Sequence, residues 1–274
     1  MKIWSEIKHT PEIFGISLAG VGTSLVLPEI KASVDVASGY SKAIDQSNYF
    51  ITHAHMDHAA GIPYVISQKA LNNHKRSTWW MPICMVQPMK NIMNEWSSLE
   101  SHEYDFEFVG VKTGDVIELG KNWKMDVFDS VHRIPTCGYR LSKLRKNLKR
   151  EYKNLPEGEI RKLTHEGVIV SENFWQSQFA YTGDTQIEVF DKNPELLDVK
   201  YLFVEVTYFD SGKSVEEARK WGHIHFDEIL PLIDQFKGDY LVFVHPSRRH
   251  KPAEIQRICE DKLSVSQKQK VVLF

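Results

Sequence analysis

The stretch that decides the fold runs Tyr49-Phe50-Ile51-Thr52-His53-Ala54-His55-Met56-Asp57-His58-Ala59-Ala60-Gly61. The apolar run that ends at Thr52 predicts a buried strand. Three histidines and one aspartate follow it within six positions. Imidazole nitrogens and carboxylate oxygens are the ligands that zinc prefers. On an extended chain His53 and His55 point the same way, whereas Asp57 and His58 stand where a helix would begin, so this cluster can serve two adjacent metal ions.

The alternative for this stretch is a polar turn in which Asp57 caps a helix and the histidines are merely exposed. The density of the His-x-His-x-Asp-His spacing argues against that alternative. Asp35 lies before a short loop to Gly39, near where the metal site would lie. A site role and an ordinary turn role for Asp35 are equally compatible with its surroundings.

Further candidate ligands repeat the pattern of a strand followed by a ligand. His132, Asp184 and His245 each come after an apolar, β-rich run. If those strands align in one sheet, their ends converge on a single rim. Helical segments between the strands would cover the outer faces, which predicts a layered α/β arrangement.

The composition of the chain limits the classes of protein to which it can belong. The chain has 274 residues, 42% of them hydrophobic, and no Gly/Ser/Pro-rich linker, so we expect a single domain over 1–274. The net charge of −2 excludes a uniformly basic nucleic-acid coat. Three widely spaced cysteines make a disulfide framework improbable and favour a reducing cytoplasm. No stretch approaches the roughly 18 apolar residues of a membrane span, so no membrane association is expected.

Two other features concern charged residues: a buried acid and a basic segment. Glu205 stands in the apolar run 201–207, and a buried carboxylate is costly without a partner. The segment 140–153 carries seven basic residues against one acid and is predicted to be a Lys-rich helix. It is either a solvated helix face or a surface that binds a phosphate backbone.

The His-x-His-x-Asp-His motif after an apolar strand resembles the signature of the metallo-β-lactamase superfamily. Within it the chain most resembles the short form of the ribonuclease Z family, over nearly its whole length. The resemblance implies a four-layer αβ/βα sandwich with two zinc ions at one edge; manganese and iron accept the same ligands. It assigns His53, His55 and His132 to the first ion, Asp57, His58 and His245 to the second, and Asp184 as a bridge.

The same resemblance supplies catalytic residues. The family pairs a glutamate in a His-Glu-Ala-Thr motif with a histidine in a His-Ser-Thr motif, and Glu205 and His223 stand at the matching positions. The expected reaction is attack on phosphorus by a metal-activated hydroxide, with His223 as general acid oriented by Glu205. Asp57 completes the expected catalytic set.

The resemblance implies removal of the 3′ trailer of precursor tRNA and, commonly, a homodimer. The residues expected to bind substrate match the family's basic loop near the scissile end of the RNA: Lys143, Arg145, Lys146 and Lys149. The family's Gly/Pro-rich arm finds no counterpart between Tyr139 and Thr182. That absence keeps open a hydrolase of small phosphodiesters or related esters. A non-catalytic RNA-binding relative is the second alternative, and the presence of all seven candidate ligands argues against it.

Overall fold

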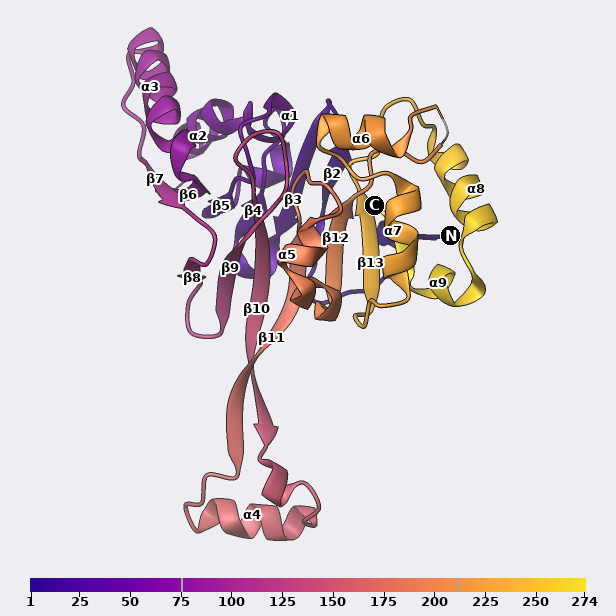
Figure 1. Cartoon of the computed structure of the whole chain (residues 1–274). Helices are drawn as coiled ribbons and strands as arrows, with labels where there is room; N and C mark the ends of the chain where they lie inside the picture. The colour runs from indigo at the N-terminus through magenta and orange to yellow at the C-terminus, as the bar shows by residue number, and fades with distance from the viewer. Residues whose placement is uncertain (75, 211) are drawn as a thin grey trace.

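The computed structural model describes residues 1–74, 76–210 and 212–274, and its strands form two sheets packed face to face (Figure 1). The first sheet follows the order of the chain. β2 and β3 and then β3 and β4 pair antiparallel, whereas the strands from β4 to β7 pair parallel. Its strands are β2 (Phe14–Leu18), β3 (Gly22–Leu27), β4 (Ala32–Val34), β5 (Asn48–Phe50), β6 (Ser77–Pro82) and β7 (Phe106–Val111).

The second sheet combines an antiparallel half with a parallel half. β8, β9, β10 and β11 pair antiparallel, and from β11 through β12, β13 and β14 to β1 the pairs are parallel. Across the sheet the order is β1 (Lys2–Ile3), β14 (Val271–Leu273), β13 (Tyr240–Val244), β12 (Tyr201–Glu205), β11 (Ser171–Tyr181), β10 (Cys137–Leu148), β9 (Trp123–Asp129) and β8 (Val116–Glu118).

Side chains alternate between the two faces of the sheets, as strand geometry requires. In β12, Phe203 enters the core between the sheets, where it packs with Trp4 and Phe50, whereas Leu202 and Val204 face the outer helices. Burial on both faces explains why this strand reads as an unbroken apolar run.

Helices cover both outer faces and complete four layers (Figure 1). α2 (Ile62–Leu71) and α3 (Ile83–Glu100) pack on the first sheet. The second sheet is covered by α5 (Val189–Lys192), α7 (Phe226–Ile233) and α8 (Pro252–Lys262). The short helices are α1 (Met56–Ala59), α6 (Val215–Trp221) and α9 (Val265–Lys270). The predicted α/β sandwich is confirmed.

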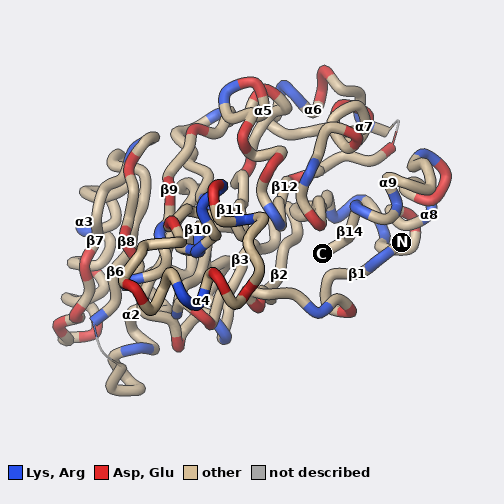
Figure 2. Tube along the Cα trace, turned by 90° about the horizontal axis from the view of Figure 1, so that it is seen from below, with Lys and Arg blue, Asp and Glu red and all other residues tan. Residues whose placement is uncertain are grey.

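A long hairpin extends beyond the body of the molecule. β10 and β11 pair from Tyr139 opposite Tyr181 to Leu148 opposite Ser171, and α4 (Glu157–His165) lies at the tip (Figure 1). The expectation of a Lys-rich helix over 140–153 is wrong, because the chain pairs as a strand up to Leu148. The expectation that no protruding arm lies between Tyr139 and Thr182 is wrong for the same reason. Viewed from below, where the hairpin protrudes, basic and acidic residues are interspersed over the molecule (Figure 2).

Candidate metal centre

The structure brings the predicted ligands together at the sheet edge where four strands end. His53 and His55 follow β5, and α1 carries Asp57 and His58 directly after them. The remaining three come from the other sheet: His132 after β9, Asp184 after β11 and His245 after β13. Two groups divide these seven residues, His53–His55–His132–Asp184 and Asp57–His58–His245, and within each group the ligand atoms lie within 4.8 Å of one another. A third group of the same size limit, Asp184–His223–His245, overlaps both and brings His223 to the same place.

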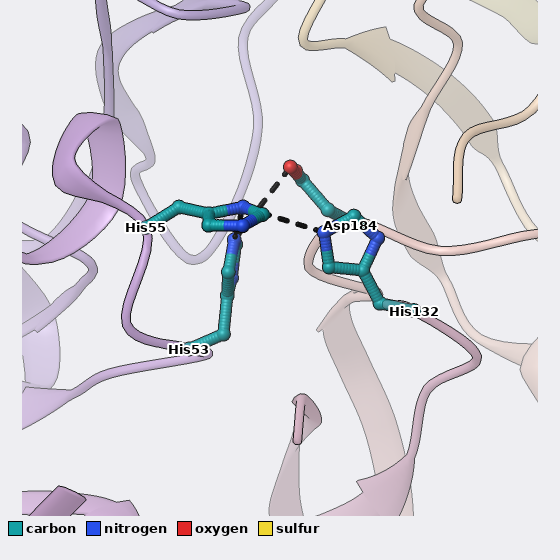
Figure 3. A group of neighbouring side chains, drawn as sticks. All are labelled: His53, His55, His132 and Asp184. Carbon is teal, nitrogen blue, oxygen red and sulfur yellow. Dashed lines mark hydrogen bonds and ion pairs between the residues drawn. The ribbon is translucent and has the colours of Figure 1, made fainter. Parts of the chain in front are cut away.

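In the first group the imidazole nitrogens face a common point (Figure 3). Nδ1 of His55 lies 3.0 Å from Nε2 of His53 and 3.4 Å from Nε2 of His132. Oδ2 of Asp184 lies 3.7 Å from Nε2 of His53. Tetrahedral ligands bound about 2.0–2.1 Å from zinc stand roughly 3.3 Å apart. These separations therefore match a zinc-sized cation.

In the second group Asp184 presents its other oxygen. Oδ1 of Asp184 lies 3.3 Å from Nε2 of His58 and 3.5 Å from Nε2 of His245. Oδ2 of Asp57 lies 3.4 Å from the same nitrogen of His245. Asp184 thus offers one carboxylate oxygen to each group and can bridge two cations.

Polar groups behind the cluster fix the orientation of the imidazole rings. The N–H of the second ring nitrogen of a ligating histidine donates a hydrogen bond to such a group, which turns the other nitrogen toward the metal. Here an outer Nδ1 contacts a partner in four cases: His53 with Thr52 Oγ1 at 2.9 Å, His58 with Asp35 Oδ2 at 2.7 Å, His132 with the Gly222 carbonyl at 2.8 Å, and His245 with Thr207 Oγ1 at 3.2 Å.

Asp35 belongs to this supporting layer and not to an ordinary turn. It is fully buried, with a positive φ of 56°, and it accepts hydrogen bonds from the Thr52 amide at 2.8 Å and the Thr52 hydroxyl at 2.9 Å. The same carboxylate binds His58. Sequence reasoning left Asp35 undecided because both contacts depend on β4 and β5 pairing in space.

The cluster passes a test of whether it suits a cation. Nε2 of His58 and Oδ1 of Asp184 are buried and lack a hydrogen-bond partner in the described part of the chain. A buried polar atom without a partner is costly. A cation bound to both His58 Nε2 and Asp184 Oδ1 would satisfy these two atoms. The donor set of imidazoles and carboxylates is therefore that of a divalent-metal site.

The ionisation states agree with this conclusion. Burial lowers the pKa of His53 and His132. Burial would raise the pKa of Asp184, but His245 and His58 hold it well below its usual value. Burial would lower the pKa of His58, but Asp184 and Asp35 raise it well above its usual value. Without metal, the positive charge of protonated His58 offsets the negative charge of the buried carboxylates. Metal binding releases such protons.

Glu205 and His223 lie beside the cluster and contact each other. Oε1 of Glu205 is 2.9 Å from Nδ1 of His223 and accepts from the amides of Thr185 and Ile224 at 3.1 and 3.3 Å. Its Oε2 accepts from the hydroxyl of Thr207 at 2.8 Å. The expected partner of the buried Glu205 is therefore His223. The ring of His223 lies 5.3 Å from that of His132 and 5.5 Å from that of His245.

A further cluster of Asp210, His250 and Glu254 does not suit a metal. Nε2 of His250 accepts from the Phe209 amide at 3.3 Å, so in the neutral ring the proton resides on Nδ1. That N–H faces both carboxylates at 3.9 Å and has no lone pair to give a cation. His250 and His225 are buried and serve the structure, since His225 caps α7.

The basic residues expected to bind substrate lie away from the cluster. Lys143, Arg145 and Lys146 belong to β10, and Lys149 follows it. The Cys137 amide, at the start of β10, donates to Thr52 beside the cluster. At about 3.3 Å per residue, Lys143 is roughly 20 Å and Lys149 roughly 40 Å farther along. The four residues therefore lie along the hairpin and not beside the cluster, and their role in binding substrate stays a prediction.

Comparisons with known proteins agree with this geometry. Residues 48–246 match the family model of the beta-lactamase superfamily domain. The chain is 31% identical over 246 residues to tRNase Z TRZ1 of Arabidopsis thaliana, which covers 89% of this chain and 88% of that relative. It is 29% identical to the chloroplastic tRNase Z TRZ2 of the same plant, over 89% of this chain and 70% of that relative.

Among solved structures, the human short-form tRNase Z superposes with a TM-score of 0.62 over 96% of this chain and 95% of that one. The two are 16% identical in sequence, so this likeness concerns the fold. In the described residues no helix has the length and apolar character needed to cross a membrane.

Proposed function

The chain belongs to the β-lactamase superfamily and, within it, to the ribonuclease Z family, and from this premise we propose that it removes the 3′ trailer of precursor tRNA as a metal-dependent endoribonuclease. The observation that carries the proposal is the Glu205–His223 pair set beside two ligand groups that share Asp184. Ligand groups alone suit many hydrolases, whereas this pair adds a proton donor at the same edge.

The proposed cofactor is a pair of zinc ions, with manganese or iron as metals of similar ligand preference. His53, His55 and His132 would hold one ion, Asp57, His58 and His245 the other, and Asp184 both. When bound, the ions would supply an activated water and would neutralise charge on the phosphate. Elemental analysis of the purified protein tests the number and identity of the ions.

Proton transfer is assigned to this chain's own residues. Burial would lower the pKa of His223, but the Glu205 carboxylate raises it to about 9. Glu205 thus favours the protonated form of His223, which can give its Nε2 proton to the leaving 3′ oxygen. Burial would raise the pKa of Asp57, but His245 and His58 lower it, so Asp57 is ionised and can accept a proton from the attacking water.

The hairpin supports a macromolecular substrate. A missing arm was the reason to consider small phosphodiesters, and the β10–β11 protrusion removes that reason. Lys143, Arg145, Lys146 and Lys149 lie along the hairpin, at a distance from the cluster that suits contact with the body of a tRNA and not with the cleaved phosphate. We assign them to backbone phosphates there.

Three further expectations remain proposals. The chain acts as one domain over 1–274, as a homodimer, and in the cytoplasm. Sedimentation of the purified protein tests the dimer. A fluorescent fusion tests the location, with nucleus or chloroplast as the outcomes that would replace the cytoplasm.

The proposed function is tested with two RNAs that carry the same 3′ trailer, one on a folded tRNA and one on an unstructured strand. We expect a single cut at the 3′ end of the folded tRNA and little cleavage of the other. Equal cleavage of both RNAs would contradict a tRNA-processing role. Turnover of small phosphodiesters without RNA cleavage would identify a small-molecule hydrolase instead.

A further inference from the structure

An arginine and a tryptophan stand together beside the cluster without a role in it. Arg133 directly follows His132, and Trp221 ends α6 two residues before His223. The guanidinium carbon of Arg133 lies 5.0 Å from the centre of the Trp221 ring, over its face. Trp221 is 48% exposed. An exposed indole beside a cationic guanidinium is the combination on which the bases of single-stranded RNA stack.

The pair is held in a fixed place relative to the cluster. Gly222 follows Trp221 with a φ of +81°, and its carbonyl binds Nδ1 of His132 at 2.8 Å. A Cβ at Gly222 would meet that nitrogen at 2.6 Å, so only glycine fits here. The end of α6 is anchored by Gln186, whose amide donates to the Arg219 carbonyl at 2.7 Å. Trp221 is thus preorganised beside His132 and His223.

Arg133 is available to a ligand. It is exposed, and among the described residues it forms no ion pair with a carboxylate. It also lines a cavity of about 530 Å³ together with His132 and Lys112. Trp221 does not line this cavity, so the cavity offers room for a phosphate at Arg133 and not for a base on the indole.

We propose that Trp221 stacks on the base of the nucleotide that carries the leaving 3′ oxygen, while Arg133 binds an adjacent phosphate. This inference rests on the proposed function. An aromatic side chain stacks on an unpaired base whatever its identity, and a guanidinium binds phosphate bidentately. The side of the cut follows from His223, which must face the leaving oxygen and lies two residues from Trp221.

The test is a double-mutant cycle between protein and RNA. Trp221→Leu is compared with wild type on precursor tRNA with and without the base 5′ of the cut. We expect either change alone to lower kcat/KM roughly 5- to 150-fold, and the two together to lower it no further than one. Trp221→Phe should recover most of the loss. Trp96→Leu, at an equally exposed tryptophan on α3, is the matched control.

Arg133 is tested by salt dependence. Arg133→Met keeps the apolar stem over Trp221 and removes one phosphate contact, so the slope of log KM against log salt should fall by roughly 0.7. Trp221→Leu should leave that slope as in wild type.

The stacking would be overturned if the losses in kcat/KM from Trp221→Leu and from the missing base multiplied in the doubly changed pair. Cleavage by Trp221→Leu at the wild-type rate would also overturn it. Failure of the wild-type protein to cut any precursor tRNA would instead overturn the proposed function.

Discussion

Nδ1 of His223 lies 2.9 Å from Oε1 of Glu205, eighteen residues away in sequence. Through Thr207 the same carboxylate also reaches His245, since the Thr207 hydroxyl contacts Oε2 of Glu205 and Nδ1 of His245. One buried glutamate therefore positions both the proposed proton donor and a proposed metal ligand.

Substitution of His223 should remove catalysis and leave metal binding. His223→Ala is expected to lower the rate of RNA cleavage by roughly 10²–10⁴, the usual loss for a general acid. Because His223 is outside both ligand groups assigned to the ions, the metal content should stay at the wild-type value. Cleavage rates and elemental analysis are measured together, with His74→Ala as the control. Loss of the ions in His223→Ala would place His223 among the ligands.

The Glu205–His223 pair also predicts a pH dependence in the metal-free protein. The pKa of His223 should be about 9, and Glu205→Gln should lower it, since only the carboxylates of Asp184 and Asp57 then oppose the effect of burial. A raised folded-state pKa adds stability that is complete below about 6.5 and is lost as the pH rises through about 9. Wild type should therefore lose stability relative to Glu205→Gln across that window. An NMR titration of His223 and urea unfolding measure both effects, and an unshifted His223 would contradict them.

Asp35 should matter for metal affinity although it touches no ion. Asp35→Ala removes the group that orients His58, and loss of such a partner lowers metal affinity by roughly 10–100-fold. Zinc competition with a chelator measures this change. Asp45→Ala, at an exposed aspartate, is the control. Thermal unfolding with excess zinc separates lost affinity from lost folding, and wild-type affinity would contradict the role given to Asp35.

The hairpin should govern RNA affinity. Charge reversal to Glu at Lys143, Arg145, Lys146 and Lys149 should weaken binding of precursor tRNA most strongly at low salt, because phosphate contacts release counterions. The matched control reverses four charges away from the hairpin: Lys237 in the loop after α7, Arg257 and Lys262 on α8, and Lys268 on α9. Equal affinity of the two variants would show that the hairpin does not bind the RNA.

The sequence predicted the sandwich because its strands are apolar runs buried on both faces, as in β12 and β13. It indicated the ligands because each follows such a run. It failed on the hairpin, where both faces of β10 meet solvent beyond Leu144 and no alternation of apolar residues marks a strand. Leu141, Leu144 and Leu148 also fit a helical spacing there, and only pairing with residues near Trp175 decides for a strand. Asp35 and Thr207 could not be assigned because their partners come from distant segments.

The most direct test of the account is cleavage of a 3′-extended precursor tRNA by metal-loaded wild type and by Asp184→Ala, with metal content measured on the same samples. We predict one cut at the end of the mature tRNA by wild type. Asp184→Ala should bind at least one ion fewer and make no cut, because Asp184 faces both ligand groups. Cleavage by Asp184→Ala at the wild-type rate would contradict the account.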